Sequence, residues 1–67
     1  MSKYDKLWQY IKDINKEKLK LTMEEIKNIL GFDIDHSFLN YKKELMNYNY
    51  EVKKISLKDK YIIFKRI

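Results

Sequence analysis

The hydrophobic period of this chain changes once, and that change limits the folds it can adopt. Over most of residues 4–47, apolar side chains recur at intervals of three and four residues, which is the spacing of one helix face. In the last twenty residues they recur at every second position, as on one face of a β-strand. Helices followed by a strand pair predict an α+β fold, and 67 residues without internal repeats predict a single domain, residues 1–67.

A first helix is predicted at about residues 3–14. Ser2 and Asp5 have the spacing of a capping box at its start. After it, Leu19-Lys20-Leu21 alternates as a very short strand does. The apolar stripe of the first helix consists of Tyr4, Leu7, Trp8, Ile11 and Ile14.

A second helix is predicted at about residues 22–30, with clear signals at both ends. Thr22 is an N-cap residue, and Glu25 stands where its side chain can complete a capping box. Gly31, the only glycine, follows the helix at the position that favours left-handed backbone geometry. The buried stripe of this helix is predicted to contain Met23, Ile26, Ile29 and Leu30.

A third helix is predicted at about residues 36–47, with Asp35 or Ser37 as its N-cap. Phe38, Tyr41 and Leu45 form its apolar stripe, which leaves a polar face directed outward. Tyr48 extends the stripe, and Leu39 and Met46 lie beside it.

The C-terminal segment predicts two strands joined by a turn at Lys58-Asp59-Lys60. The alternation changes phase near Lys53-Lys54, as a β-bulge would make it do. The turn has no glycine, so we expect a loop slightly longer than a tight hairpin turn. A two-stranded hairpin is marginal in water, so it should also pair with residues 19–21. The alternating residues are Tyr48, Tyr50 and Val52, then Ile55 and Leu57, and finally Ile62 and Phe64.

All these elements are predicted to share one core. Tyr4 and Trp8 lie on the apolar stripe of the first helix, so we expect them to be buried rather than to stack on bases. Four tyrosines are expected to be exposed: Tyr10, Tyr48, Tyr50 and Tyr61. The predicted common core contains Leu7, Trp8, Ile11, Ile26, Ile29, Leu30, Phe38, Leu45, Ile62 and Phe64.

The predicted order is helix, short strand, helix, turn, helix, strand, strand, and it resembles the winged helix-turn-helix class. In that class the second helix of the pair enters the major groove, and the hairpin wing contacts the backbone or the minor groove. The resemblance implies a sequence-selective duplex DNA-binding domain of three helices with a C-terminal β-hairpin wing. Such a protein would be a regulator or accessory factor of a bacterial chromosome or mobile element.

The sequence is also similar to a family of small uncharacterised bacterial proteins that open with Lys-Tyr-x-x-Leu-Trp-x-Tyr-Leu, matched here by residues 3–11. The family continues with Leu-Thr-Phe-x-Glu-Ile and Ile-Leu-Gly, matched by residues 21–26 and 29–31. Its Val-x-x-Val-x-Leu and Val-x-Phe-x-Arg tail is matched between Val52 and Arg66. The third helix departs from the family, because Asp35-His36-Ser37-Phe38 replaces Pro-x-Ser-Ala and Glu44-Leu45 replaces paired tryptophans.

Charge points to a polyanionic partner. The net charge of +5 lies wholly in residues 36–67, which hold eight basic and three acidic side chains. Such a one-sided excess suits DNA, RNA or an anionic membrane, although an AT-rich genome also produces lysine-rich proteins. The amphipathic start and the lack of an apolar run of about 20 residues predict a cytoplasmic protein without a membrane partner.

Composition argues against an enzyme. One histidine, no cysteine and no glycine-rich loop leave no nucleophile-base pair, no thiolate metal site and no phosphate cradle. We therefore expect no cofactor and no metal. Glu24-Glu25 is explained by the helix macrodipole, which is stabilised by carboxylates at the N-terminus.

The outward face of the third predicted helix is the candidate reader of DNA sequence. Asn40 can pair with adenine and Lys43 with guanine, while Ser37 can donate to a phosphate. The same polar residues also suit an ordinary solvated helix face. The candidate DNA-binding residues of this helix are His36, Ser37, Asn40, Lys42, Lys43 and Asn47.

The predicted wing adds a second candidate contact. Lys58 and Lys60 lie at its tip and are expected to reach phosphates, with Lys53 and Lys54 on the preceding strand. Lysines on edge strands also prevent edge-to-edge aggregation. The alternative function is a protein-binding adaptor or inhibitor that presents the basic face to an acidic partner. The domain is expected to be a monomer or a weak homodimer.

Overall fold

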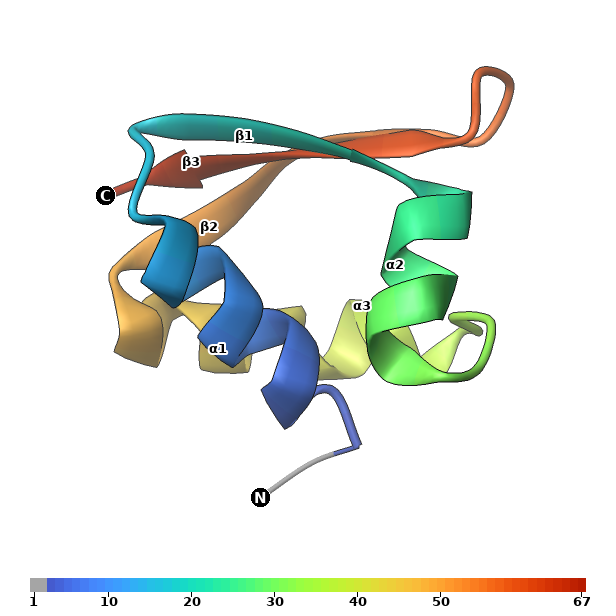
Figure 1. Ribbon diagram of the computed structural model, residues 1–67, viewed down its shortest axis with the longest axis horizontal. Helices are drawn as coiled ribbons and strands as arrows, with labels where there is room; N and C mark the ends of the chain where they lie inside the picture. Colours follow the sequence, from blue (N-terminus) through green and yellow to red (C-terminus); the bar gives the residue numbers. More distant parts are fainter. Residues whose placement is uncertain (1–2) are drawn as a thin grey trace.

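The C-terminal strand is the centre of the sheet, and the rest of the chain is arranged around it (Figure 1). The computed structural model describes residues 3–67 and shows an antiparallel sheet in the order β1-β3-β2. All helices lie on one face of this sheet, so the fold is α+β as predicted. The elements are α1 (Asp5–Ile14), β1 (Lys18–Thr22), α2 (Met23–Leu30), α3 (Ser37–Tyr41), the 3₁₀ helix η1 (Lys42–Tyr48), β2 (Tyr50–Ser56) and β3 (Tyr61–Arg66).

Strand pairing follows the alternation of apolar and polar residues. Phe64 of β3 lies between Leu19 of β1 and Val52 of β2, and these three side chains share the inner face. The register of β2 shifts between Val52 and Lys54, so Lys53 is the extra residue. The predicted bulge and the predicted pairing of residues 19–21 with the hairpin are both confirmed.

The second helix is built as its sequence predicts. The Thr22 hydroxyl accepts from the Glu25 amide at 3.1 Å, and the Glu25 carboxylate accepts from the Thr22 amide at 3.0 Å. Gly31 ends the helix with φ +85°. The first helix begins at Asp5, and the predicted capping residue Ser2 lies outside the described residues.

The third helix was predicted as one α-helix over residues 36–47, and this is wrong. The α-helical part ends at Tyr41, and seven residues of 3₁₀ helix follow to Tyr48. A 3₁₀ helix rises about 2.0 Å per residue instead of about 1.5 Å, which carries the chain farther toward the start of β2. Leu45 and Tyr48, three residues apart, face inward in either helix type, so their spacing did not distinguish the two. Tyr48 therefore belongs to this helix and not to the following strand.

The core contains nine of the ten predicted residues, and Ile29 is half-buried at its margin. Tyr50 was expected to be exposed, but only 1% of its surface is accessible. Its hydroxyl donates to the Lys16 carbonyl at 2.6 Å, so the ring is buried without an unpaired phenol. Tyr4 is buried as expected, and no helix in residues 3–67 is long and apolar enough to cross a bilayer. The complete set of buried apolar residues is Tyr4, Leu7, Trp8, Ile11, Leu21, Ile26, Leu30, Phe38, Leu45, Tyr50, Ile62 and Phe64.

Candidate nucleic-acid interface

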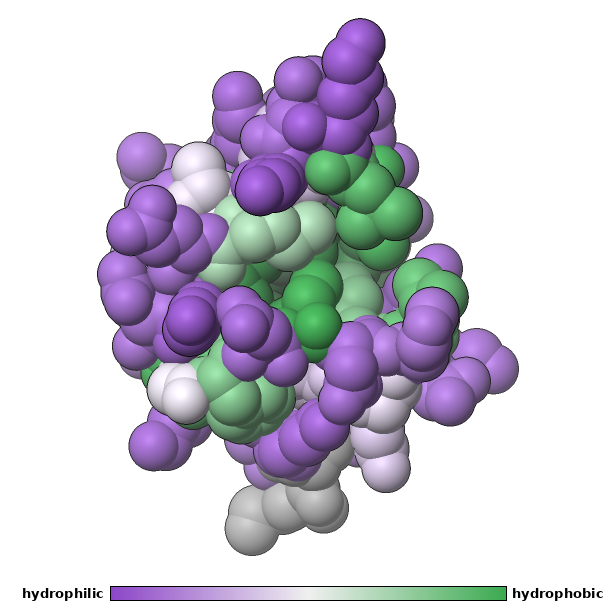
Figure 2. Space-filling view, turned by 90° about the vertical axis from the view of Figure 1, so that its right-hand side faces the viewer, coloured by the Kyte–Doolittle hydropathy of each residue, from purple (hydrophilic) through white to green (hydrophobic). Residues whose placement is uncertain are grey.

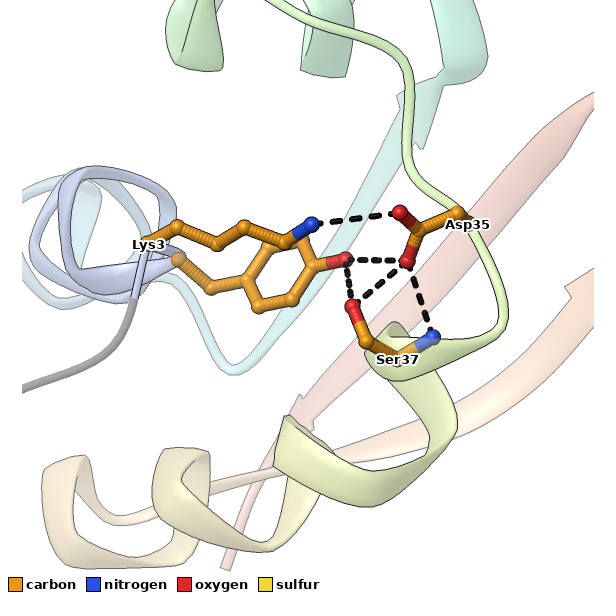
Figure 3. A network of polar contacts seen from close by, with 4 residues as sticks. Lys3, Asp35 and Ser37 are labelled. Carbon is orange, nitrogen blue, oxygen red and sulfur yellow. Dashed lines mark hydrogen bonds and ion pairs between the residues drawn. The ribbon is translucent and has the colours of Figure 1, made fainter.

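The start of α3 is fixed by a polar network around Asp35 (Figure 3). The Asp35 carboxylate accepts from the Ser37 amide at 2.8 Å and from the Ser37 hydroxyl. It also accepts from the Tyr4 hydroxyl at 3.3 Å and the Lys3 ammonium at 3.1 Å. The bonds from Ser37, followed by the one from Lys3, hold the pKa of Asp35 below its usual range. The network thereby ties the third helix to the N-terminal end of the first.

This network occupies one of the predicted DNA contacts. The Ser37 hydroxyl donates its proton to Asp35 and lies 2.9 Å from the Tyr4 hydroxyl. To donate to a phosphate, it would have to leave Asp35. The N-cap of α3 is His36, which makes no side-chain capping bond, so neither of the two predicted residues holds that position. Asp35 lies one residue earlier and accepts from the Ser37 amide.

The outward face of α3 and η1 presents a row of three of the six candidate residues. His36, Asn40 and Lys43 are exposed at intervals of four and three residues. In η1, with about three residues per turn, Asn47 lies above Glu44 and not in line with Lys43. Asn47 therefore does not extend the row formed by His36, Asn40 and Lys43. Lys42 is exposed, but it precedes the buried Leu45 by three residues and so lies on the same side of the 3₁₀ helix as Leu45.

Two apolar side chains share this outward surface. Leu39 is 51% exposed and Met46 is 59% exposed, and they precede and follow Lys43 by four and three residues. The surface is therefore mixed, with apolar groups between the polar ones.

The turn between β2 and β3 projects beyond the sheet beside α2 (Figure 1). Its four residues, 57–60, form the longer loop that the sequence predicted, and Lys60 adopts φ +57°. The Lys60 carbonyl accepts from the Met23 amide at 2.8 Å, which fixes the turn to the start of α2. The side chains of Lys58 and Lys60 are both exposed at this tip.

An apolar groove separates the start of α3 from this turn. Figure 2 shows apolar side chains gathered in the middle of this side of the molecule, with polar side chains around them. Leu57, on the wall formed by the turn, is 79% exposed. The groove has a volume of about 470 Å³ and is lined by Ile34, Asp35, His36, Phe38, Leu39, Ile55 and Leu57.

The acidic side chains beside the groove are already paired. Asp35 lies 3.1 Å from the Lys3 ammonium, and Asp33 lies 3.8 Å from the Lys27 ammonium. These are the two ion pairs found within residues 3–67. Lys58 and Lys60 take part in neither, so the turn has uncompensated positive charge.

Lys53 and Lys54 lie apart from the tip. Together they oppose Ile63 across the β-bulge, on the face of the sheet turned away from the helices. Lys20 pairs with Ile63 from the other side, and its ammonium lies 4.4 Å from the centre of the Tyr61 ring. The Lys54 ammonium lies 5.9 Å from the same ring.

The sequence-based prediction missed the lysines of β1. Lys18 and Lys20 alternate with inner-face residues, so their direction was visible in the sequence. The sequence did not show the strand order, in which β3 is central and β1 and β2 lie on either side of it.

Comparisons with protein-family models, curated proteins and solved structures found no match to this chain. Within residues 3–67, no three histidine, cysteine, aspartate or glutamate side chains gather as a metal site.

Proposed function

We propose that this chain is a winged helix-turn-helix domain that binds duplex DNA, with the third helix in the major groove and the β2–β3 turn on the backbone. One observation carries the proposal: the start of α3 and the β2–β3 turn form opposite walls of one groove. His36 lies on the first wall and Leu57 on the second. A single ligand can therefore contact the outward face of the helix and the basic turn together. The order of elements along the chain supports the same class.

The exposed residues suit the parts that this mode of binding requires. Asn40 offers a bidentate amide to adenine, and Lys43 offers donors to guanine. Leu39, exposed one residue before Asn40 and four before Lys43, suits contact with a thymine methyl group. Lys58 and Lys60 at the tip neutralise phosphates, which contributes affinity without sequence preference.

The test compares duplex binding by fluorescence anisotropy on a site selected from random duplexes. We expect Asn40→Ala to lower affinity for the selected site and to flatten preference at one base pair, by about 1–3 kcal/mol of discrimination. Lys6→Ala, an exposed change on α1, serves as the control and should keep the preference. If Asn40→Ala and Lys43→Ala both keep the wild-type preference profile, the third helix is not the reader.

The turn is tested separately by the salt dependence of binding. Each phosphate contact contributes about −0.9 to the slope of log K against log salt on duplex DNA. The double change Lys58→Ala with Lys60→Ala should therefore reduce the magnitude of that slope by roughly 1 to 2 and leave base preference unchanged. A slope that does not differ from wild type would contradict a phosphate-binding role for the turn.

The groove itself favours a second candidate function, binding of an acidic protein segment. Leu39 and Leu57 are exposed apolar side chains, and an anchor between them would bury surface that now meets water. Asp33 and Asp35 are paired, and the turn holds two lysines against the single carboxylate of Asp59, so its net charge is positive. The matching partner is an amphipathic segment with apolar anchors and flanking carboxylates.

A synthetic helical peptide with two leucines four residues apart and glutamates elsewhere tests this candidate by NMR titration. Leu39→Ser with Leu57→Ser should weaken peptide binding. Met46→Ser should not, because Met46, whose exposure lies between those of the two leucines, is not part of the groove lining. Equal effects of the two variants would reject the groove as the binding site. If both variants also keep duplex binding, DNA remains the proposed ligand of this face.

A further inference from the structure

We propose that the outer face of the sheet is a second binding surface, which takes single-stranded nucleic acid. It lies on the far side of the sheet from every helix (Figure 1), so it is separate from the third-helix face proposed for duplex DNA. The inference does not depend on duplex binding.

The centre of this surface is one aromatic ring between lysines of two different strands. Tyr61 is half-buried on β3, with Lys20 of β1 at 4.4 Å and Lys54 of β2 at 5.9 Å from its ring centre. Because β3 is the middle strand, these two lysines approach the ring from opposite sides. Ile63, also half-buried, lies between the same two lysines in the strand register.

The charge of the surface is one-sided. Cross-strand pairing aligns Lys18 with Lys65 and Lys65 with Glu51, so one acidic residue accompanies the lysines of this face. The ion pairs within residues 3–67 use Lys3 and Lys27, and neither uses a lysine of the sheet. The basic residues that lie on this face are Lys18, Lys20, Lys53, Lys54 and Lys65. A ligand with regularly spaced negative charge complements this arrangement.

The central ring favours a single strand over the other polyanions. Proteins that bind single strands without sequence preference combine a basic surface along the backbone with aromatic side chains that stack on unpaired bases. Tyr61 supplies such a side chain, and the Lys20 ammonium now lies over its ring at 4.4 Å. A stacked base would take that place, and the displaced ammonium would be close to the adjoining phosphate. A duplex keeps its base faces covered by stacking, so it would use the lysines but not the ring. An anionic membrane would require exposed apolar side chains that insert among the lipids. The apolar side chains at the centre of this face, Tyr61 and Ile63, are instead half-buried.

The experiment measures anisotropy of a labelled 15-nucleotide oligodeoxythymidine with the full chain at two salt concentrations. Lys20→Ala with Lys54→Ala should reduce the salt slope by roughly 1.4, because each phosphate contact on a single strand contributes about 0.7. Tyr61→Leu, which keeps an apolar side chain but removes the ring, should weaken binding by about fivefold or more, the lower range for one stacked base. Lys6→Ala with Lys16→Ala removes the same charge from exposed positions outside the sheet and is the matched control.

Thermal melting of each variant first establishes that it is folded. Folded sheet variants that bind oligodeoxythymidine as the control pair does would overturn the proposal. Preferential binding to phosphatidylserine vesicles, with no binding to the oligonucleotide, would also overturn it. Asn40→Ala separates the two proposals, because it should change duplex preference and leave oligodeoxythymidine binding at the wild-type level. An unchanged duplex preference would count against the third-helix face alone, and a loss of oligodeoxythymidine binding would count against the outer sheet face alone.

Discussion

The sheet offers a pair of adjacent isoleucines whose unequal burial can be tested by the same substitution. Ile62 and Ile63 are neighbours on the central strand, but Ile62 is fully buried against the helices and Ile63 is half-buried on the outer face. Ile62→Val and Ile63→Val each remove one methylene group from a β-branched side chain. We expect the first change to be clearly destabilising and the second to be nearly neutral.

The magnitude follows from burial. Removal of a methylene from a packed core costs about 0.5–1.5 kcal/mol, and surface changes usually stay within about 0.5 kcal/mol. A domain of 67 residues is stabilised by roughly 3–10 kcal/mol in total, so the loss at Ile62 is a measurable fraction that still leaves the protein folded. For a domain of this size, about 1 kcal/mol lowers Tm by about 4–8 °C.

Urea unfolding followed by fluorescence provides the assay, because Trp8 is the only tryptophan and is buried in the same core. The two variants should show the same m value as the wild type and differ from each other in midpoint. A shift of one residue in strand register would exchange the two faces. Equal losses, or a larger loss for Ile63→Val, would therefore refute the arrangement of the sheet described here.

Three further changes probe single interactions by urea unfolding. Tyr50→Phe should cost about 0.5–1.5 kcal/mol because it removes the hydrogen bond to the Lys16 carbonyl, and an unchanged midpoint would contradict that bond. Gly31→Ala should cost about 1–2 kcal/mol because of its positive φ, with Gly31→Asn less costly, and equal stability of all three would contradict the left-handed cap. The lowered pKa of Asp35 stabilises the fold above its unfolded pKa near 3.8, and this contribution is lost as pH falls toward the folded value. Asp35→Asn should therefore lose less stability than wild type between about pH 5 and pH 2, and parallel pH profiles would argue against the network.

The parts of the fold that depend on neighbours in the sequence were predictable. The capping box of Thr22 and Glu25 and the cap at Gly31 use residues a few positions apart, so their spacing fixes the geometry. The bulge was visible for a similar reason, since one extra residue at Lys53 reverses the alternation in β2.

The errors came from features that depend on distant segments. Tyr50 was predicted to be exposed because the sequence does not show that the Lys16 carbonyl, 34 residues earlier, accepts its hydroxyl. The change from α to 3₁₀ helix at Lys42 was missed because both types bring residues three apart to one side. In the candidate site, Asn47 is four residues from Lys43, a spacing that shares a side in an α-helix but not in a 3₁₀ helix. Ser37 belongs to a network that includes Tyr4, 33 residues earlier.

The lysines of the sheet show how strand order changes the functional reading of a sequence. Lys20 and Lys54 are 34 positions apart, and taken separately each suits an ordinary solvated strand. Had β1 paired with β2, both would still point outward, but Tyr61 would lie at the edge with a lysine strand on one side. Because β3 is in the centre, its ring has a lysine on each side, and the half-buried aromatic becomes the middle of a basic surface. The lysines at the tip of the turn and those of the outer sheet face are thus two separate groups, and each can be removed by mutation without the other.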